Sequence, residues 1–77
     1  MARTITESAL LKAIQHVAEA RRIVASQRAL IGELKEVGCS TADAERTLRV
    51  FEASLTTLES HERNMRNRAI ARTAARS

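Results

Sequence analysis

LIGELKEVGCSTADAERTL, residues 30–48, decides the fold because its composition changes in the middle. On both sides of the centre, helix-forming residues carry aliphatic side chains at helical spacing, whereas the centre, GCST at 38–41, does not. Four residues suit a turn between two helices and are too few for a linker between domains. The stretch therefore predicts one helix that folds back on another.

The residues around the turn carry the signals of a helix end and a helix start. Gly38 stands where a left-handed residue closes a helix, and Leu34 and Cys39 can make the apolar contact that accompanies it. Ser40 or Thr41 can then cap a second helix. We predict a first helix over residues 5–37 and a turn over 38–41.

The first helix begins with a capping box, because Thr4 can cap it and Glu7 follows three residues later. A heptad pattern then gives two apolar rows: Leu10, Val17, Val24, Ile31 and Ala13, Ala20, Gln27, Leu34. A third row lies beside them: Ala9, Ile23, Leu30, Val37. The apolar stripe is therefore wider than the seam of a two-stranded coiled coil requires.

The second helix is predicted over residues 42–66 from its own apolar stripe. Its rows are Ala44, Phe51, Leu58, Met65 and Leu48, Leu55. The stripe stops after Met65, so we expect residues 1–66 to form the hairpin and residues 67–77 to form a basic tail that frays.

An all-α, antiparallel two-helix hairpin is thus the predicted fold, in a chain of only 77 residues with a single aromatic side chain. A core of small aliphatic residues in so short a chain is thin and gains stability from a partner. A second copy would cover the stripe most economically, which predicts a homodimeric four-helix bundle, or else pairing with another helical protein. The residues expected at that interface are Val17, Val24, Ile31, Leu34, Leu48, Phe51, Leu55 and Leu58.

The positive charge is concentrated at the C-terminal end. Residues 1–62 hold eight basic and nine acidic side chains, whereas residues 63–77 hold five arginines and no acidic residue. Such a segment can contact phosphates, and nucleic-acid binding is the alternative function. With no aromatic side chain available for base stacking, that binding would depend on salt concentration and would be largely independent of the nucleic-acid sequence. The candidate contacts are Arg63, Arg66, Arg68, Arg72 and Arg76.

Few residues in the chain point to chemistry. There is no glycine-rich phosphate loop and no pair of carboxylates at catalytic spacing, so we expect no enzyme and no cofactor. The hairpin register brings His16 level with His61, beside Glu19 and Glu62, which leaves a metal site open as a third possibility. The spacing matches no familiar ligand pattern, and a structural or solvated histidine pair is the simpler interpretation.

The expected location is the cytoplasm. No segment approaches the length of a membrane span, and the N-terminal residues lack the apolar core of a signal peptide. Cys39 is the only cysteine, which excludes an intrachain disulfide and suits a reducing compartment.

Residues 16–66 resemble a group of short alphaproteobacterial proteins that have no assigned activity. The likeness is carried in the first helix by His16, Ala18, Glu19, Ala20, Arg21, Ile23, Gln27, Arg28, Leu30, Ile31, Leu34 and Gly38, and in the second by Thr41, Ala44, Leu48, Phe51, Leu55 and His61. It implies a hairpin in a bacterial cytoplasm and supplies no site residues. The hairpin and its wide apolar stripes predict a small non-enzymatic regulatory or adaptor protein that acts through helix–helix contacts.

Overall fold

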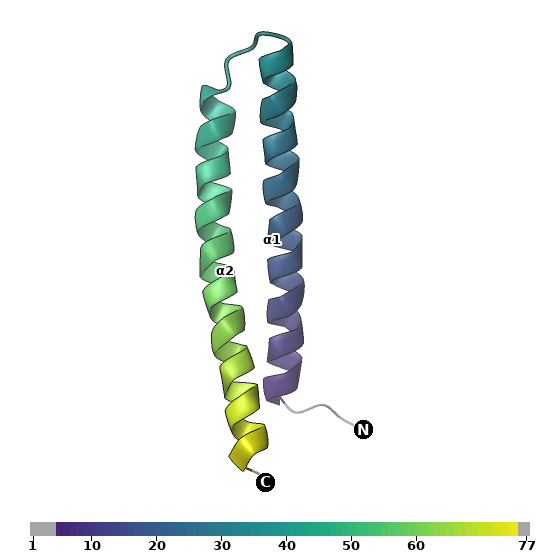
Figure 1. Cartoon of the computed structure of the whole chain (residues 1–77), viewed down its shortest axis with the longest axis vertical. Coiled ribbons are helices and arrows are strands. Elements are labelled where there is room, and N and C mark those ends of the chain that lie inside the picture. The colour runs from purple at the N-terminus through teal and green to yellow at the C-terminus, as the bar shows by residue number, and fades with distance from the viewer. Residues whose placement is uncertain (1–4, 76–77) are drawn as a thin grey trace.

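The computed structural model describes residues 5–75, which form two long α-helices and no strand. Helix α1 spans Ile5–Glu36 and helix α2 spans Ala42–Ala75. The two helices pack side by side in opposite directions, and the turn lies at one end of the rod (Figure 1). The principal extents are 60, 21 and 14 Å, so the protein is a single layer of two helices. The predicted all-helical hairpin is confirmed.

The turn ends α1 through backbone hydrogen bonds that a left-handed glycine makes possible. The Cys39 N–H donates to the Leu34 carbonyl at 2.9 Å, and the Gly38 N–H donates to the Lys35 carbonyl at 3.1 Å. Gly38 has a φ of 74°, in the region that favours glycine. Two carbonyls that the helix end would leave unpaired are thereby satisfied.

Replacement of Gly38 measures the effect of backbone conformation on stability without a change in packing. A Cβ added at Gly38 meets nothing within 4 Å, so we expect Gly38→Ala to cost about 1–2 kcal/mol through conformation alone. Gly32 is the matched control, because it lies inside α1 and an added Cβ there also meets nothing within 4 Å. Gly32→Ala is expected to stabilise the protein by about 0.5–1 kcal/mol in urea unfolding. If both substitutions changed the free energy of unfolding in the same direction, a left-handed backbone conformation at Gly38 would be contradicted.

Helix α2 starts with local polar contacts. The Ser40 hydroxyl accepts from the Ala42 N–H at 3.4 Å, and the Thr41 carbonyl accepts from the Glu45 N–H at 2.8 Å. Of the two expected caps, the hydroxyl that contacts the helix start is therefore that of Ser40. The cap expected for α1, Thr4, lies outside the described residues.

The core lies along the line where the helices meet, and α1 supplies most of it. The buried residues are Ala13, Val17, Val24, Ile31 and Met65. The apolar stripe of α2 is only half-buried along the same line, at Leu48, Phe51, Leu55 and Leu58. One layer of helices covers each stripe from one side, so much of the apolar surface stays in contact with solvent.

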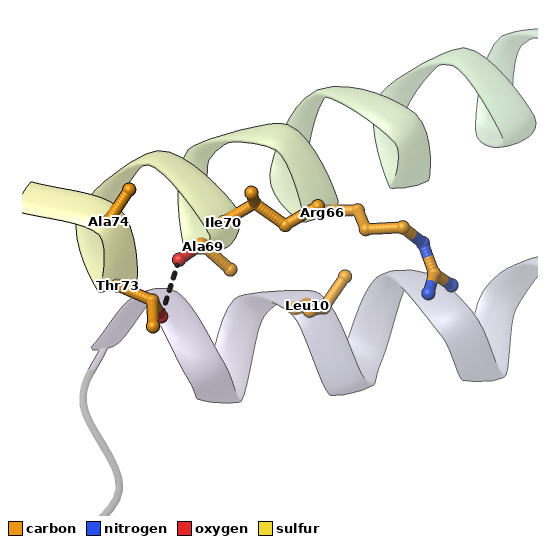
Figure 2. A pocket seen from close by; sticks show the side chains of 6 residues that line it. All are labelled: Leu10, Arg66, Ala69, Ile70, Thr73 and Ala74. Carbon is orange, nitrogen blue, oxygen red and sulfur yellow. Dashed lines mark hydrogen bonds between the residues drawn. The ribbon is translucent and has the colours of Figure 1, made fainter.

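Helix α2 continues to Ala75 rather than ending near residue 66. Small side chains extend its contact with α1 beyond Met65, since Ala69 is half-buried and Ala13 on the other helix is 3% exposed. At this end Leu10 faces Ala69 and Ile70 across a shallow groove of about 430 Å³ (Figure 2). Alanine packing supports helix here although the row of large apolar residues has stopped.

Candidate interaction surface

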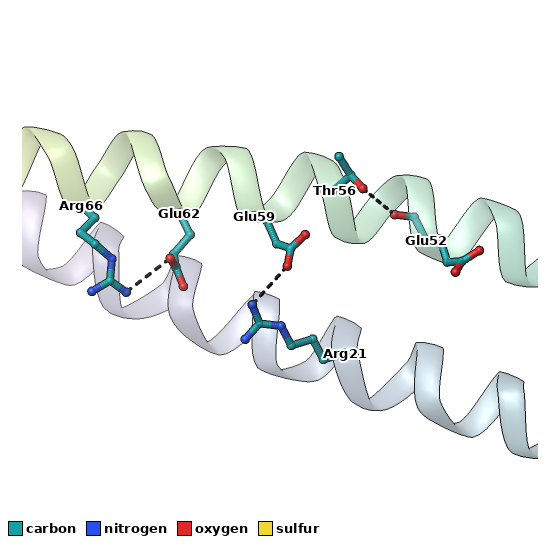
Figure 3. Close-up of polar contacts among 6 residues, drawn as sticks. All are labelled: Arg21, Glu52, Thr56, Glu59, Glu62 and Arg66. Carbon is teal, nitrogen blue, oxygen red and sulfur yellow. Dashed lines mark hydrogen bonds and ion pairs between the residues drawn. The ribbon is translucent and has the colours of Figure 1, made fainter.

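One side of the helix pair, which we call the polar flank, is closed by two ion pairs between the helices. Arg21 contacts Glu59 at 3.1 Å, and Arg28 contacts Glu52 at 2.8 Å. Figure 3 shows the Arg21–Glu59 contact reaching from one helix to the other. Each pair is solvent-exposed and contributes at most about 1 kcal/mol. They mark which sides of α1 and α2 lie next to each other.

At the level of these two ion pairs, the opposite side is apolar on α1. Ile23 and Leu30 each follow a polar-flank arginine by two positions, which turns them about 200° around the helix axis. Ile23 is 41% exposed and Leu30 is 42% exposed. Ser54 and His61 follow Glu52 and Glu59 by the same two positions, so they border this side from α2. We call this side of the helix pair the apolar flank, after the exposed Ile23 and Leu30 on α1.

A shallow groove opens in the apolar flank near the middle of the rod. It has a volume of about 210 Å³ and is lined by His16, Glu19, Ala20, Ile23 and Leu58. The small Ala20 side chain leaves room between Ile23 on α1 and Leu58 on α2. The groove is thus an apolar depression beside an exposed aliphatic side chain, which is the shape that a side chain from another helix fills.

Gln27 holds the turn end of the hairpin in register. Its Nε2 donates to the Ala44 carbonyl at 2.9 Å in a half-buried setting. The amide stands in an otherwise apolar row and satisfies its donor on the backbone of the other helix. A polar residue of this kind fixes the alignment of packed helices, because sliding either helix would leave it without a partner.

The residues expected at an interface fall into two groups. Val17, Val24 and Ile31 are buried between α1 and α2 within one chain. The other five are half-buried and keep part of their apolar surface in solvent: Leu34, Leu48, Phe51, Leu55 and Leu58. Ile23 and Leu30 are exposed and were not among the residues expected at an interface. The sequence feature that could have identified them is the third apolar row of the first helix.

The predicted basic set does not form one surface. Its members are Arg63, Arg66, Arg68, Arg72 and Arg76. Arg66 contacts Glu62 at 3.3 Å (Figure 3), and Arg63 borders the same mixed-charge region. Arg68 and Arg72 are exposed one helical turn apart on a different side of α2. The last member lies outside the described residues.

His16 and His61 are both exposed. Among residues 5–75, no three His, Cys, Asp or Glu side chains gather in a way that could hold a metal ion. Cys39 is an exposed free thiol in the turn. Neither of the two described helices has the length and apolar composition to cross a membrane.

No protein-family model, curated protein or solved structure matches this chain. The apolar flank offers aliphatic side chains next to a partly covered core, and this chemistry suits packing against another helix.

Proposed function

We propose that this protein is a small non-enzymatic regulatory or adaptor module that acts through helix–helix contacts. Its apolar flank docks on a second copy, and the two hairpins form a four-helix bundle with two-fold symmetry. The observation that carries this proposal is the difference between the flanks from the middle of the rod to the turn: two ion pairs close one side there, whereas Ile23 and Leu30 are exposed on the other.

The surface area of the chain supports a partner. Its accessible surface is 5902 Å², whereas a compact monomer of 8.5 kDa exposes roughly 4,700 Å². A face of 60 by 21 Å projects roughly 1,300 Å², and a standard interface takes about 800 Å² from each partner. One broad face of the hairpin is therefore large enough for a stable interface.

A second hairpin would also complete the burial that the first one leaves unfinished. Phe51 and Leu58 are half-buried on α2, and Leu58 lines the groove in the apolar flank. Removing apolar surface from water contributes about 25 cal/mol for each Å². The same docking would cover the exposed side chains of Ile23 and Leu30, so one partner would bury apolar surface of both the core and the apolar flank.

Two leucines on α1 test the proposal because their exposure is nearly equal. Leu30 is 42% exposed on the apolar flank, and Leu11 is 38% exposed on a different side of the helix. We expect Leu30→Glu to weaken self-association at least about 30-fold, since it places a charged side chain where an aliphatic one packs in the interface. Leu11→Glu is expected to leave association unchanged in sedimentation velocity. Equal effects of the two variants would contradict docking through this flank.

Contact with nucleic-acid phosphates is a second candidate, favoured by the helical continuation that sets Arg68 and Arg72 one turn apart. The arginines are divided between two sides of α2, and neither side offers more than about three phosphate contacts, so the logarithmic salt slope on duplex DNA should be about −3 or shallower. Fluorescence anisotropy at several salt concentrations measures it, and Arg68→Ala with Arg72→Ala should abolish binding. Absence of binding by the native chain would remove the candidate, and a slope near −4.5 would mean that all five arginines converge.

A further inference from the structure

We infer that the second copy lies antiparallel to the first, with the two turns at opposite ends of the bundle and the two-fold axis at the groove beside Ala20. This inference rests on the proposed self-association and adds the orientation of the partner. It follows from where the groove lies, from the sizes of the side chains along the flank and from the distribution of charge along the rod.

The groove lies at the middle of both helices. The centre of α1, Ile5–Glu36, falls between residues 20 and 21, and the centre of α2, Ala42–Ala75, falls between residues 58 and 59. Ala20 and Leu58 both line the groove. Two antiparallel rods that overlap completely have their two-fold axis at mid-length. The depression in the apolar flank is therefore at the place where the two copies meet symmetrically.

Side-chain size changes along the flank in the way that an antiparallel partner requires. The heptad row of the flank is small or polar toward the N-terminus of α1, at Ala9 and His16, and large toward the turn, at Ile23 and Leu30. Antiparallel overlap sets Leu30 between Ala9 and His16 of the second copy's row, and it sets Ile23 between His16 and Ile23 of that row. Large side chains then face the small half of the row, which fills space well.

A parallel arrangement would match sizes badly. It would oppose Ile23 to Ile23 and Leu30 to Leu30, while Ala9 would face Ala9 across a gap. Antiparallel packing instead inserts Ile23 of each copy beside Ala20 of the other, where the groove of about 210 Å³ receives it. Ile23 of each copy thus meets a depression rather than Ile23 of the other copy.

The charge along the rod favours the same orientation. The open end, residues 5–15 and 64–75, holds four basic and one acidic side chain, a formal charge of +3. The turn end, residues 27–52, holds four basic and five acidic side chains, a formal charge of −1. Parallel docking places two +3 ends together, whereas antiparallel docking places each +3 end beside a −1 end.

The exposed thiol of Cys39 allows the orientation to be measured on the native sequence. A nitroxide spin label on Cys39 reports the distance between the two turns by pulsed dipolar spectroscopy. At 1.5 Å per residue, the antiparallel bundle places the labels about 50–60 Å apart, and a parallel bundle places them within about 35 Å. A control protein carries the label at mid-length instead, through Cys39→Ser with Arg22→Cys. It should give a distance within about 35 Å in either orientation.

The two labelled proteins separate the possible failures. A long Cys39 distance with a short control distance supports the antiparallel bundle. Short distances in both proteins would overturn the orientation while leaving self-association intact. Absence of any intermolecular distance in both proteins would overturn the proposed self-association, and the orientation with it.

Discussion

Val17→Asp is expected to unfold most of the protein. Val17 is 1% exposed and lies in the line of contact between the helices, where the other buried side chains are all aliphatic or thioether. An aspartate there has no buried cation to pair with, and an uncompensated buried charge costs several kcal/mol. A core of this size supplies only about 3–5 kcal/mol of net stability, so the substitution removes nearly all of it.

Far-UV circular dichroism during thermal unfolding measures this loss. The matched control is Val50→Asp, which makes the same change at a residue that is 60% exposed in α2. The control is expected to keep a cooperative transition within a few degrees of the native chain. If Val17→Asp retained the same transition as Val50→Asp, the contact line between α1 and α2 would not include Val17.

Phe51→Ala is expected to cost about 3 kcal/mol in the assembled bundle and less in a single hairpin. The ring is half-buried against α1 in one chain, and the proposed partner covers the remainder. Loss of a fully buried phenylalanine costs about 3–5 kcal/mol, and a half-buried ring loses a corresponding fraction. The free-energy difference between variant and native chain should therefore grow with protein concentration.

Thermal unfolding at two widely separated protein concentrations tests this expectation. Val50→Ala controls for helix propensity, because Val50 is the preceding residue and is exposed. We expect its effect to stay within about 0.5 kcal/mol at both concentrations. A Phe51→Ala protein that melts with the native chain at both concentrations would show that the ring contributes to neither contact.

The turn and the two helices were predictable because their signals are local. Gly38 bonds to Lys35 within the same turn of chain, and Ser40 contacts Ala42 two residues away. The sequence did not reveal that α2 continues to Ala75. Large apolar residues end at Met65, and the packing of Ala69 near the start of α1 depends on a helix more than fifty positions earlier in the chain.

The division of the apolar stripe into core and flank was also beyond the sequence. Three adjacent heptad rows on α1 are apolar, and periodicity alone cannot say which rows face α2. The structure buries the row of Val17, Val24 and Ile31, and the ion pairs of Arg21 with Glu59 and Arg28 with Glu52 accompany this alignment across 38 and 24 positions of sequence. Ile23 and Leu30 become the exposed row only once this alignment exists.

Sedimentation equilibrium of the native chain, from micromolar to millimolar concentration, tests the central claim most directly. Docking of the apolar flank on a second copy predicts a mass that rises to about 17 kDa, twice the 8.5 kDa of one chain, and then stays constant. A mass of 8.5 kDa at every concentration would show that the flank does not bind a second copy. A mass that kept rising beyond two chains would contradict a closed two-fold bundle.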